Sequence, residues 1–194
     1  MGTGRLEAFS DAVIAIIITI MVLEFQVPHG DSPAELLPLL PVFVSYVLSF
    51  VYIGIYWNNH HHLLHACSTV TGGILWANLH LLFWLSLLPF ATGWMGENNF
   101  TAVPTALYGV VLLMAAIAYY LLQQAIIRAQ GPDSILKRAV GRDWKGKLSP
   151  VLCIVAIGAT LVLSWIAVAI LATLALMWLI PDRRIESALP RNED

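Results

Sequence analysis

Residues 8–25 read AFSDAVIAIIITIMVLEF, and this stretch decides the fold. An α-helix rises about 1.5 Å per residue, so roughly 20 apolar residues cross the roughly 30 Å of hydrocarbon in a bilayer. At this length only a helix satisfies the backbone hydrogen bonds within one segment. We therefore expect residues 8–25 to form a transmembrane helix that carries Asp11 as an unusual charge.

The composition of the whole chain agrees with a membrane protein. Of its 194 residues, 59% are hydrophobic and 11% are charged, whereas a soluble domain carries roughly 25% charged residues. The net charge of −2 offers no basic surface, so we expect no nucleic-acid partner. Cys67 and Cys153 form no CxxC pair, and neither a zinc site nor a disulfide is indicated.

Five further apolar runs predict an all-α, polytopic membrane protein with six transmembrane helices. They are residues 36–57, 74–94, 103–127, 148–164 and 166–180. The last two form one run that is too long for a single span of roughly 20 residues, and Ser164–Trp165 is the only plausible turn in it. By length alone, five or seven helices also fit. No soluble domain is indicated, so residues 1–194 are expected to form one transmembrane domain.

The ten Lys and Arg residues fall on alternate polar segments. They precede the first span, separate the fourth from the fifth, and follow the sixth: Arg5; Arg128, Lys137, Arg138, Arg142, Lys145 and Lys147; Arg183, Arg184 and Arg191. Cytoplasmic loops of membrane proteins carry the excess of such residues. Both termini are therefore expected in the cytoplasm, with Asp31, Glu35 and Glu97 outside, and only an even number of spans agrees.

The first span has two different faces. At about 100° per residue, Asp11 points roughly 140° away from Ile16. Phe9, Ile16, Ile20 and Leu23 fall within a narrow arc on the other side. The helix thus combines a polar face near its cytoplasmic end with a stripe of bulky apolar side chains.

Polar groups on the second and third spans lie at the same depth as Ser10 and Asp11. The second span ends in WNNHHH, residues 57–62, and the third begins with WANLH, residues 76–80. Ionisable groups at membrane depth are costly and need a partner or a function. We expect a structural network that joins three helices and includes Arg5, Ser10, Asp11, some of residues 58–61, Asn78 and His80.

The same polar residues allow other interpretations. Ser10, Asp11 and a histidine are the components of a hydrolase triad, but neighbouring helical residues diverge by about 100°, so we expect no enzyme. His61 and His65 have the i, i+4 spacing of two metal ligands. A solvated histidine cluster or a pH sensor explains them as well, and the sequence assigns no metal site.

Residues 5–11, RLEAFSD, resemble the RxxxFSD motif that opens the first helix in the transmembrane-protein-175 family of K⁺ channels. Further similarities at Trp57, His60, His61 and residues 78–89 extend the resemblance over mainly the first three spans. Family members with a single six-helix repeat are tetramers. The resemblance therefore implies the prokaryotic form: a homotetramer around a central pore in the plasma membrane.

In that family, the first helix of each subunit lines the pore, and aliphatic side chains form the constriction. Carried over by distance from the FSD motif, the pore positions are Ile16, Ile20 and Leu23, with Thr19 as a polar contributor to selectivity. Glu24 follows at the outer mouth, where it either concentrates cations or only marks the helix end. The resemblance implies that Arg5, Phe9, Ser10 and Asp11 of the motif hold the polar network together behind the pore. The expected structural network also includes Trp57, His60, His61, Asn78 and His80.

The function implied by this resemblance is a K⁺-permeable channel with a hydrophobic gate. A ring of isoleucines offers no oxygens to replace hydration water, so the preference for K⁺ over Na⁺ is expected to be modest. We expect K⁺ as the permeant ion, membrane lipids as partners, and no cofactor. One alternative is a proton-coupled secondary transporter that uses Asp11 and His80, although the sequence indicates neither paired repeats nor helices broken at the midplane. A non-conducting scaffold is another.

Overall fold

The computed structural model describes residues 2–131, 136–137 and 144–179. Within them, every regular element is a helix, as the sequence predicts. The α-helices are α1 (Thr3–Met21), α2 (Leu40–His65), α3 (Gly72–Ser86), α4 (Leu88–Glu97), α5 (Ala102–Gln130), α7 (Trp144–Ala159) and α8 (Ser164–Leu179). Two 3₁₀ helices, η1 (Val22–Glu24) and η2 (Pro33–Leu39), lie between α1 and α2.

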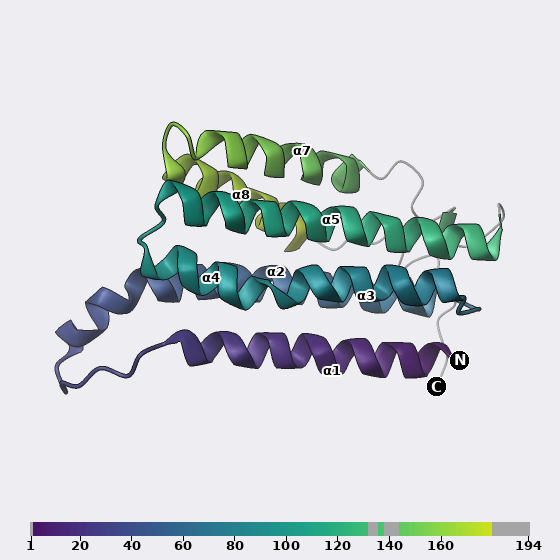
Figure 1. Cartoon of the computed structure of the whole chain (residues 1–194), viewed down its shortest axis with the longest axis horizontal. Coiled ribbons are helices and arrows are strands. Elements are labelled where there is room, and N and C mark those ends of the chain that lie inside the picture. Colours follow the sequence, from purple (N-terminus) through teal and green to yellow (C-terminus); the bar gives the residue numbers. More distant parts are fainter. Residues whose placement is uncertain (1, 132–135, 138–143, 180–194) are drawn as a thin grey trace.

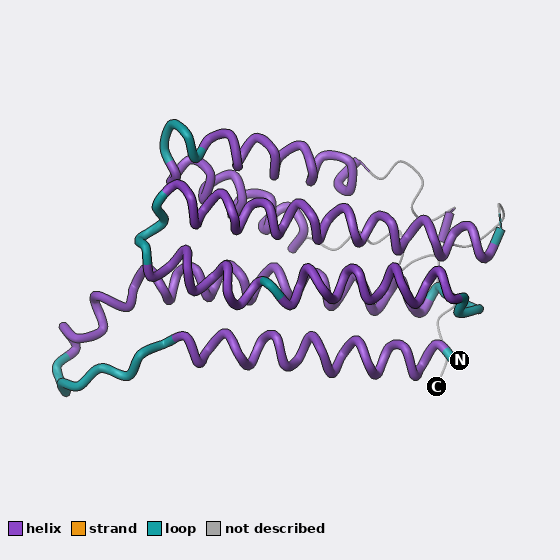
Figure 2. The backbone as a smooth tube through the Cα atoms, viewed as in Figure 1, coloured by secondary structure: helices purple, strands orange, loops and turns teal. Residues whose placement is uncertain are grey.

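Successive helical passes run antiparallel to one another along the long axis of the molecule, which is horizontal in Figure 1. One end of the molecule holds the start of α1, the α2–α3 turn and the last turn of α5 (Figures 1 and 2). The opposite end holds the α1–α2 connection, the α4–α5 turn and the α7–α8 turn. Because α3 and α4 follow one another in a single pass, the described helices make six passes in all.

Four of these passes are long and apolar enough to cross a membrane: Thr3–Glu24, Pro33–His65, Gly72–Glu97 and Ala102–Gln130. The remaining two, α7 and α8, each have 16 described residues, or about 24 Å of helix. Ile180, the expected last residue of the sixth span, lies outside the described residues. The six passes occupy the six apolar stretches that the sequence indicates.

The turn between α7 and α8 lies at residues 160–163, and not at Ser164–Trp165 as expected. Ser164 and Trp165 instead form the first turn of α8. The N–H groups of Val162 and Leu163 donate to the carbonyl of Ala159 and close the turn. A hydropathy pattern does not reveal this turn, because apolar residues form most of it.

The third pass is broken at Leu87, although the sequence indicated no break. Pro89 has no N–H to donate to the carbonyl four residues earlier, so a regular α-helix cannot continue through it. The Leu87 N–H bonds to the carbonyl of Trp84, only three residues back, at 3.3 Å. The chain resumes as α4, which begins at Leu88.

A glycine allows α4 to approach α2 closely. A Cβ atom at Gly96 would lie 2.5 Å from the Ser45 hydroxyl and 2.8 Å from the Cα of Val42. Small residues at helix crossings in membranes allow backbones to come together and gain van der Waals contact. The α2–α4 contact therefore holds the second and third passes together behind α1.

Candidate functional site

One face of α1 is anchored in the protein and the other is uncovered. The buried positions are Leu6, Ser10, Ile14, Ile17 and Met21, spaced three or four residues apart as on one helix face. This face packs against α2, α3 and α4, and α1 lies at the edge of the molecule (Figure 1). The first helix is therefore a peripheral element with a free side.

The free side carries the residues that the sequence assigned to the pore. Ile16 is 56% exposed, Ile20 is 43% exposed and Leu23 is 77% exposed. Thr19 is exposed as well, and its hydroxyl donates back to the carbonyls of Ala15 and Ile16, 3.1 and 3.0 Å away. This leaves the oxygen of Thr19 available only as an acceptor.

A groove runs between α1 and α4 beside this stripe. Its walls include Ile16 and Ile20 from α1 and Pro89 and Gly93 from α4, and Glu24 lies at one end. A Cβ atom at Gly93 would lie 2.9 Å from a carboxylate oxygen of Glu24. The missing side chain at position 93 thus makes the space in which the Glu24 carboxylate lies.

Behind α1, a buried chain of hydrogen bonds joins three helices. The Asn78 side-chain N–H donates to the Ser10 hydroxyl at 2.9 Å, and that hydroxyl donates to the Leu6 carbonyl at 2.9 Å. His60 Nε2 lies 2.7 Å from the side-chain oxygen of Asn78, which only accepts, so Nε2 carries the proton. Ser10, Asn78 and His60 are all buried, and this chain ties α1 to α3 and α2.

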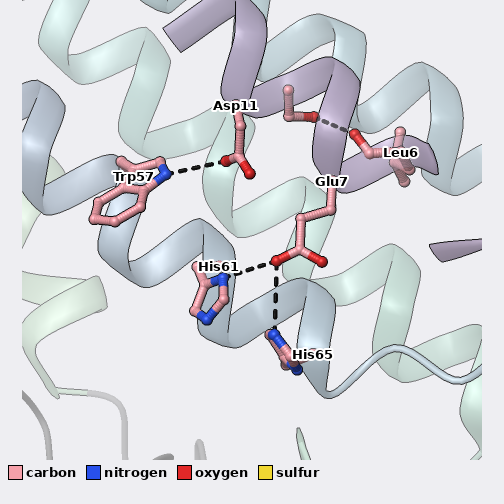
Figure 3. A network of polar contacts seen from close by, with 7 residues as sticks. Leu6, Glu7, Asp11, Trp57, His61 and His65 are labelled. Atoms are coloured by element: carbon pink, nitrogen blue, oxygen red, sulfur yellow. Dashed lines mark hydrogen bonds and ion pairs between the residues drawn. The ribbon is translucent and has the colours of Figure 1, made fainter. Parts of the chain in front are cut away.

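A second set of polar contacts joins α1 to α2 alone (Figure 3). The Trp57 indole N–H donates to Asp11 at 3.0 Å. One turn away, Glu7 Oε1 lies 2.7 Å from His61 Nδ1 and 3.6 Å from His65 Nε2. Because α1 and α2 are antiparallel, moving one turn back along α1 from Asp11 to Glu7 corresponds to moving one turn forward along α2 from Trp57 to His61.

Three residues of the expected network lie elsewhere. Arg5 and Phe9 are exposed, and within the described residues no hydrogen bond or ion pair links Arg5 to the others. His80 accepts from the indole N–H of Trp84, on its own helix, at 3.0 Å. It lies two residues after Asn78, or about 200° around the helix, and therefore faces away from α1.

The sequence interpretation missed two groups of polar residues. Glu7 pairs with His61, and the signal for it was the shared i, i+4 spacing of Glu7 with Asp11 and of Trp57 with His61. Ser49 from α2 lies 2.7 Å from the Thr92 hydroxyl of α4 and donates to Tyr108 of α5 at 3.0 Å. Single hydroxyls in long apolar runs give no such signal.

A hydrolase-like arrangement is not assembled from Ser10 and Asp11. Ser10 bonds to Asn78 on α3, whereas Asp11 bonds to Trp57 on α2. The divergence of neighbouring helical side chains thus places the two groups in separate contacts.

Comparison with known proteins places this site in a family. Residues 5–89, which span α1 to the start of α4, match the family described as endosomal/lysosomal potassium channel TMEM175. The chain is 53% identical to a potassium channel of Chryseobacterium sp. (strain P1-3) over 192 residues, covering 99% of this chain and 100% of that one. It is 29% identical to a potassium channel of Chamaesiphon minutus over 188 residues, covering 90% and 92% of the two chains.

A solved structure has the same fold. The crystal structure of a lysosomal potassium-selective channel TMEM175 homolog from Chamaesiphon minutus superimposes with a TM-score of 0.79 at 28% identity. The superposition covers 93% of this chain and 97% of that chain. With its RLEAFSD segment, its six helical passes and these relatives, the chain belongs to the TMEM175 family.

Proposed function

We propose that this chain is one subunit of a K⁺-permeable channel, a homotetramer in which α1 lines the central pore. The observation that supports this best is the division of α1 into an anchored face and an uncovered apolar face that carries Ile16, Ile20 and Leu23. An apolar stripe of this kind suits either lipid or a hydrophobic pore, and the RLEAFSD segment that precedes it favours the pore. The relatives that match along their whole length are named potassium channels.

The pore is closed by dewetting at rings of Ile16, Ile20 and Leu23, and it has no carbonyl filter. Narrow apolar rings exclude water and ions, and wider ones pass ions that keep most of their hydration shell. Selectivity for K⁺ over Na⁺ is therefore modest, and the Thr19 oxygen adds to it. Glu24 lies toward the outer mouth and attracts cations there.

Charge supports a cytoplasmic location for the end at which α1 begins. Arg5 lies in the first turns of α1 and Arg128 in the last turn of α5, which share this end, and Lys145 and Lys147 lie in the first turn of α7, which begins on the same side but short of the end. Glu24, Glu35 and Glu97 lie at the opposite end. By the positive-inside rule, the N-terminus faces the cytoplasm. The relatives that match along their whole length are bacterial proteins, which supports the plasma membrane of a prokaryotic cell as the location. Arg138, Arg142, Arg183, Arg184 and Arg191 lie outside the described residues.

The alternative function is a proton-coupled transporter, and the broken third pass is the observation in its favour, since transporters use such breaks to bind ions. Here the break carries its own hydrogen bonds: Ala91 N–H donates to Leu87, and the Thr92 hydroxyl donates to Leu88. Asp11 and His80 bond to different tryptophans, Trp57 and Trp84. These contacts favour a channel over a relay between Asp11 and His80.

Recording from purified protein in planar bilayers tests this function. With K⁺ on one side and Na⁺ on the other, a channel gives unitary currents whose reversal potential lies on the K⁺-selective side of zero. Protein-free bilayers of the same lipid are the control. Saturable, proton-dependent flux without unitary currents would instead establish the transporter.

A further inference from the structure

We propose that Glu7, His61 and His65 bind a divalent transition-metal ion of the zinc class and so clamp the start of α1 to the end of α2. Within the described residues, these three are the only group of His, Cys, Asp and Glu side chains close enough to share one ion. Figure 3 shows the three side chains converging from the two helices.

The geometry of the three donor atoms fits a small ion. Glu7 Oε1 is 2.7 Å from His61 Nδ1 and 3.6 Å from His65 Nε2, and all three ligand atoms lie within 4.8 Å of one another. Ligands about 2.0–2.1 Å from a tetrahedral Zn²⁺ are about 3.3 Å apart. An ion would replace the hydrogen bond between Glu7 and His61, so these two atoms would separate from 2.7 Å to about 3.3 Å, while His65 Nε2 at 3.6 Å is already close to that spacing.

The donor set has the chemistry of a known class of metal site. Two imidazoles and one carboxylate are a donor set that binds Zn²⁺ and leaves a fourth position for water. His61 and His65 lie at i, i+4 on α2, the spacing that places two histidines on one face of a helix. Hard ions such as Mg²⁺ prefer oxygen ligands, so the imidazoles favour Zn²⁺, Co²⁺ or Ni²⁺.

The site is open enough for an ion to enter and rigid enough to hold it. The side chains of Glu7, His61 and His65 are 23%, 41% and 53% exposed. Glu7 is held one turn from Asp11, which is itself bonded to Trp57. The adjacent His60 is directed to Asn78 instead and is not a ligand.

Occupancy of this site bears on conduction, and this step rests on the proposed function. Glu7 and Ile16 are on the same helix, about 13 Å apart along its axis. An ion bound at Glu7 fixes the cytoplasmic end of α1 against α2. We therefore expect the open probability of a pore lined by α1 to change when the site is filled.

Binding is tested on the full-length protein in detergent, purified with a tag that contains no histidine. Calorimetric titration with Zn²⁺, and the visible absorption of bound Co²⁺, give the stoichiometry and ligand class. We expect one ion per chain and a higher Tm with Zn²⁺. His65→Ala and Glu7→Gln weaken binding at least ten-fold, whereas His29→Ala, in the α1–α2 connection at the other end, leaves it unchanged.

The outcomes separate this proposal from the proposed channel. Equal Zn²⁺ affinity of the wild type, His65→Ala and Glu7→Gln would refute the site, even if the protein conducts. Loss of binding in these two variants establishes the site, even if no currents are found. In a conducting protein, Zn²⁺ added on the cytoplasmic side changes the open probability of the wild type and not of His65→Ala; an equal response of both would refute the clamp on α1.

Discussion

Residues on the two faces of α1 have different roles, which depend on their positions around the helix. Ser10 is buried and takes part in a hydrogen-bond chain with Asn78 and His60. Ile16 is exposed, and its apolar side chain forms no hydrogen bond. Replacing the first kind changes stability, because it leaves buried polar groups unpaired. Replacing an exposed residue such as Ile16 instead changes the chemistry of the uncovered face of α1, with little expected effect on stability.

Ile16→Cys makes conduction sensitive to charged thiol reagents if that surface faces the pore. Modification places a charge in an apolar constriction, so we expect block or altered conductance in single-channel recording. Ile154→Cys on α7 is the matched control: Ile154 is 59% exposed, against 56% for Ile16, but α7 and α1 lie on opposite sides of the bundle. Equal effects of the reagent on both variants would contradict the pore assignment.

The two native cysteines give little background in this experiment. Cys67 and Cys153 are both buried, and burial raises the pKa of the Cys67 thiol, so the reactive thiolate is scarce at neutral pH. We expect the folded protein to resist a charged maleimide and to take up two labels per chain after denaturation in detergent and heat, as mass spectrometry measures. Rapid labelling of folded protein would show that the cysteines are accessible.

Asn78→Ala leaves both Ser10 and His60 without their buried partner. The expected loss is about 1–3 kcal/mol, the range for a buried polar group that becomes unsatisfied. It appears as a lower Tm in detergent. Ser86→Ala is the control on the same helix, because its exposed hydroxyl bonds only to the Phe83 carbonyl. A Tm equal to that of the control would mean that the chain of bonds contributes nothing.

Whole helices follow the sequence pattern closely, and the deviations have local causes. The apolar runs locate all six passes, and the polar residues of α1, α2 and α3 predict that Ser10, His60 and Asn78 come together. The predicted position of the α7–α8 turn was wrong, because a turn made mainly of apolar residues has the same hydropathy as the helices beside it. His80 points away from α1 because membrane depth alone does not fix the direction around a helix.

Gly96→Ala separates α4 from α2. The added methyl group meets the Val42 backbone and the Ser45 hydroxyl at less than 3 Å, so the helices must move apart. Overpacking of this kind costs about 1–3 kcal/mol, which a thermal melt of the purified protein detects. Gly54→Ala on α2 meets nothing within 4 Å and is expected to leave the Tm unchanged or raise it. Similar melts for both variants would argue against close packing at Gly96.

For the whole molecule, the single chain has an uncovered apolar side on α1, which the proposed tetramer would turn toward its pore. The α1 stripe and the groove beside α4 are continuous through Ile16 and Ile20, which belong to both. Sequence periodicity predicts such a stripe but not whether it faces lipid, its own subunit or a neighbour. The prediction that the stripe faces a pore comes from the family resemblance of the RLEAFSD segment that precedes it.

Asp11→Ala lowers the yield of assembled oligomer. The change leaves the Trp57 N–H without its acceptor and loosens α1 at the end where it is anchored to α2. Size-exclusion chromatography with light scattering measures the tetramer fraction. Asp31→Ala, an exposed residue of the α1–α2 connection, serves as the control. A normal tetramer fraction in Asp11→Ala would show that this contact does not support assembly.

The apolar turn at residues 160–163 has a consequence for how the protein is seated in lipid. Leu161 and Val162 are exposed, and the N–H groups of residues 160–163 are all bonded to carbonyls in the last turn of α7. Because these N–H groups need no water, an apolar turn of this kind enters the hydrocarbon region at a lower cost than a polar loop would. Since α7 and α8 each provide about 24 Å of described helix against a hydrocarbon core of about 30 Å, we expect this side of the protein to be the most sensitive to hydrophobic mismatch when acyl chains lengthen.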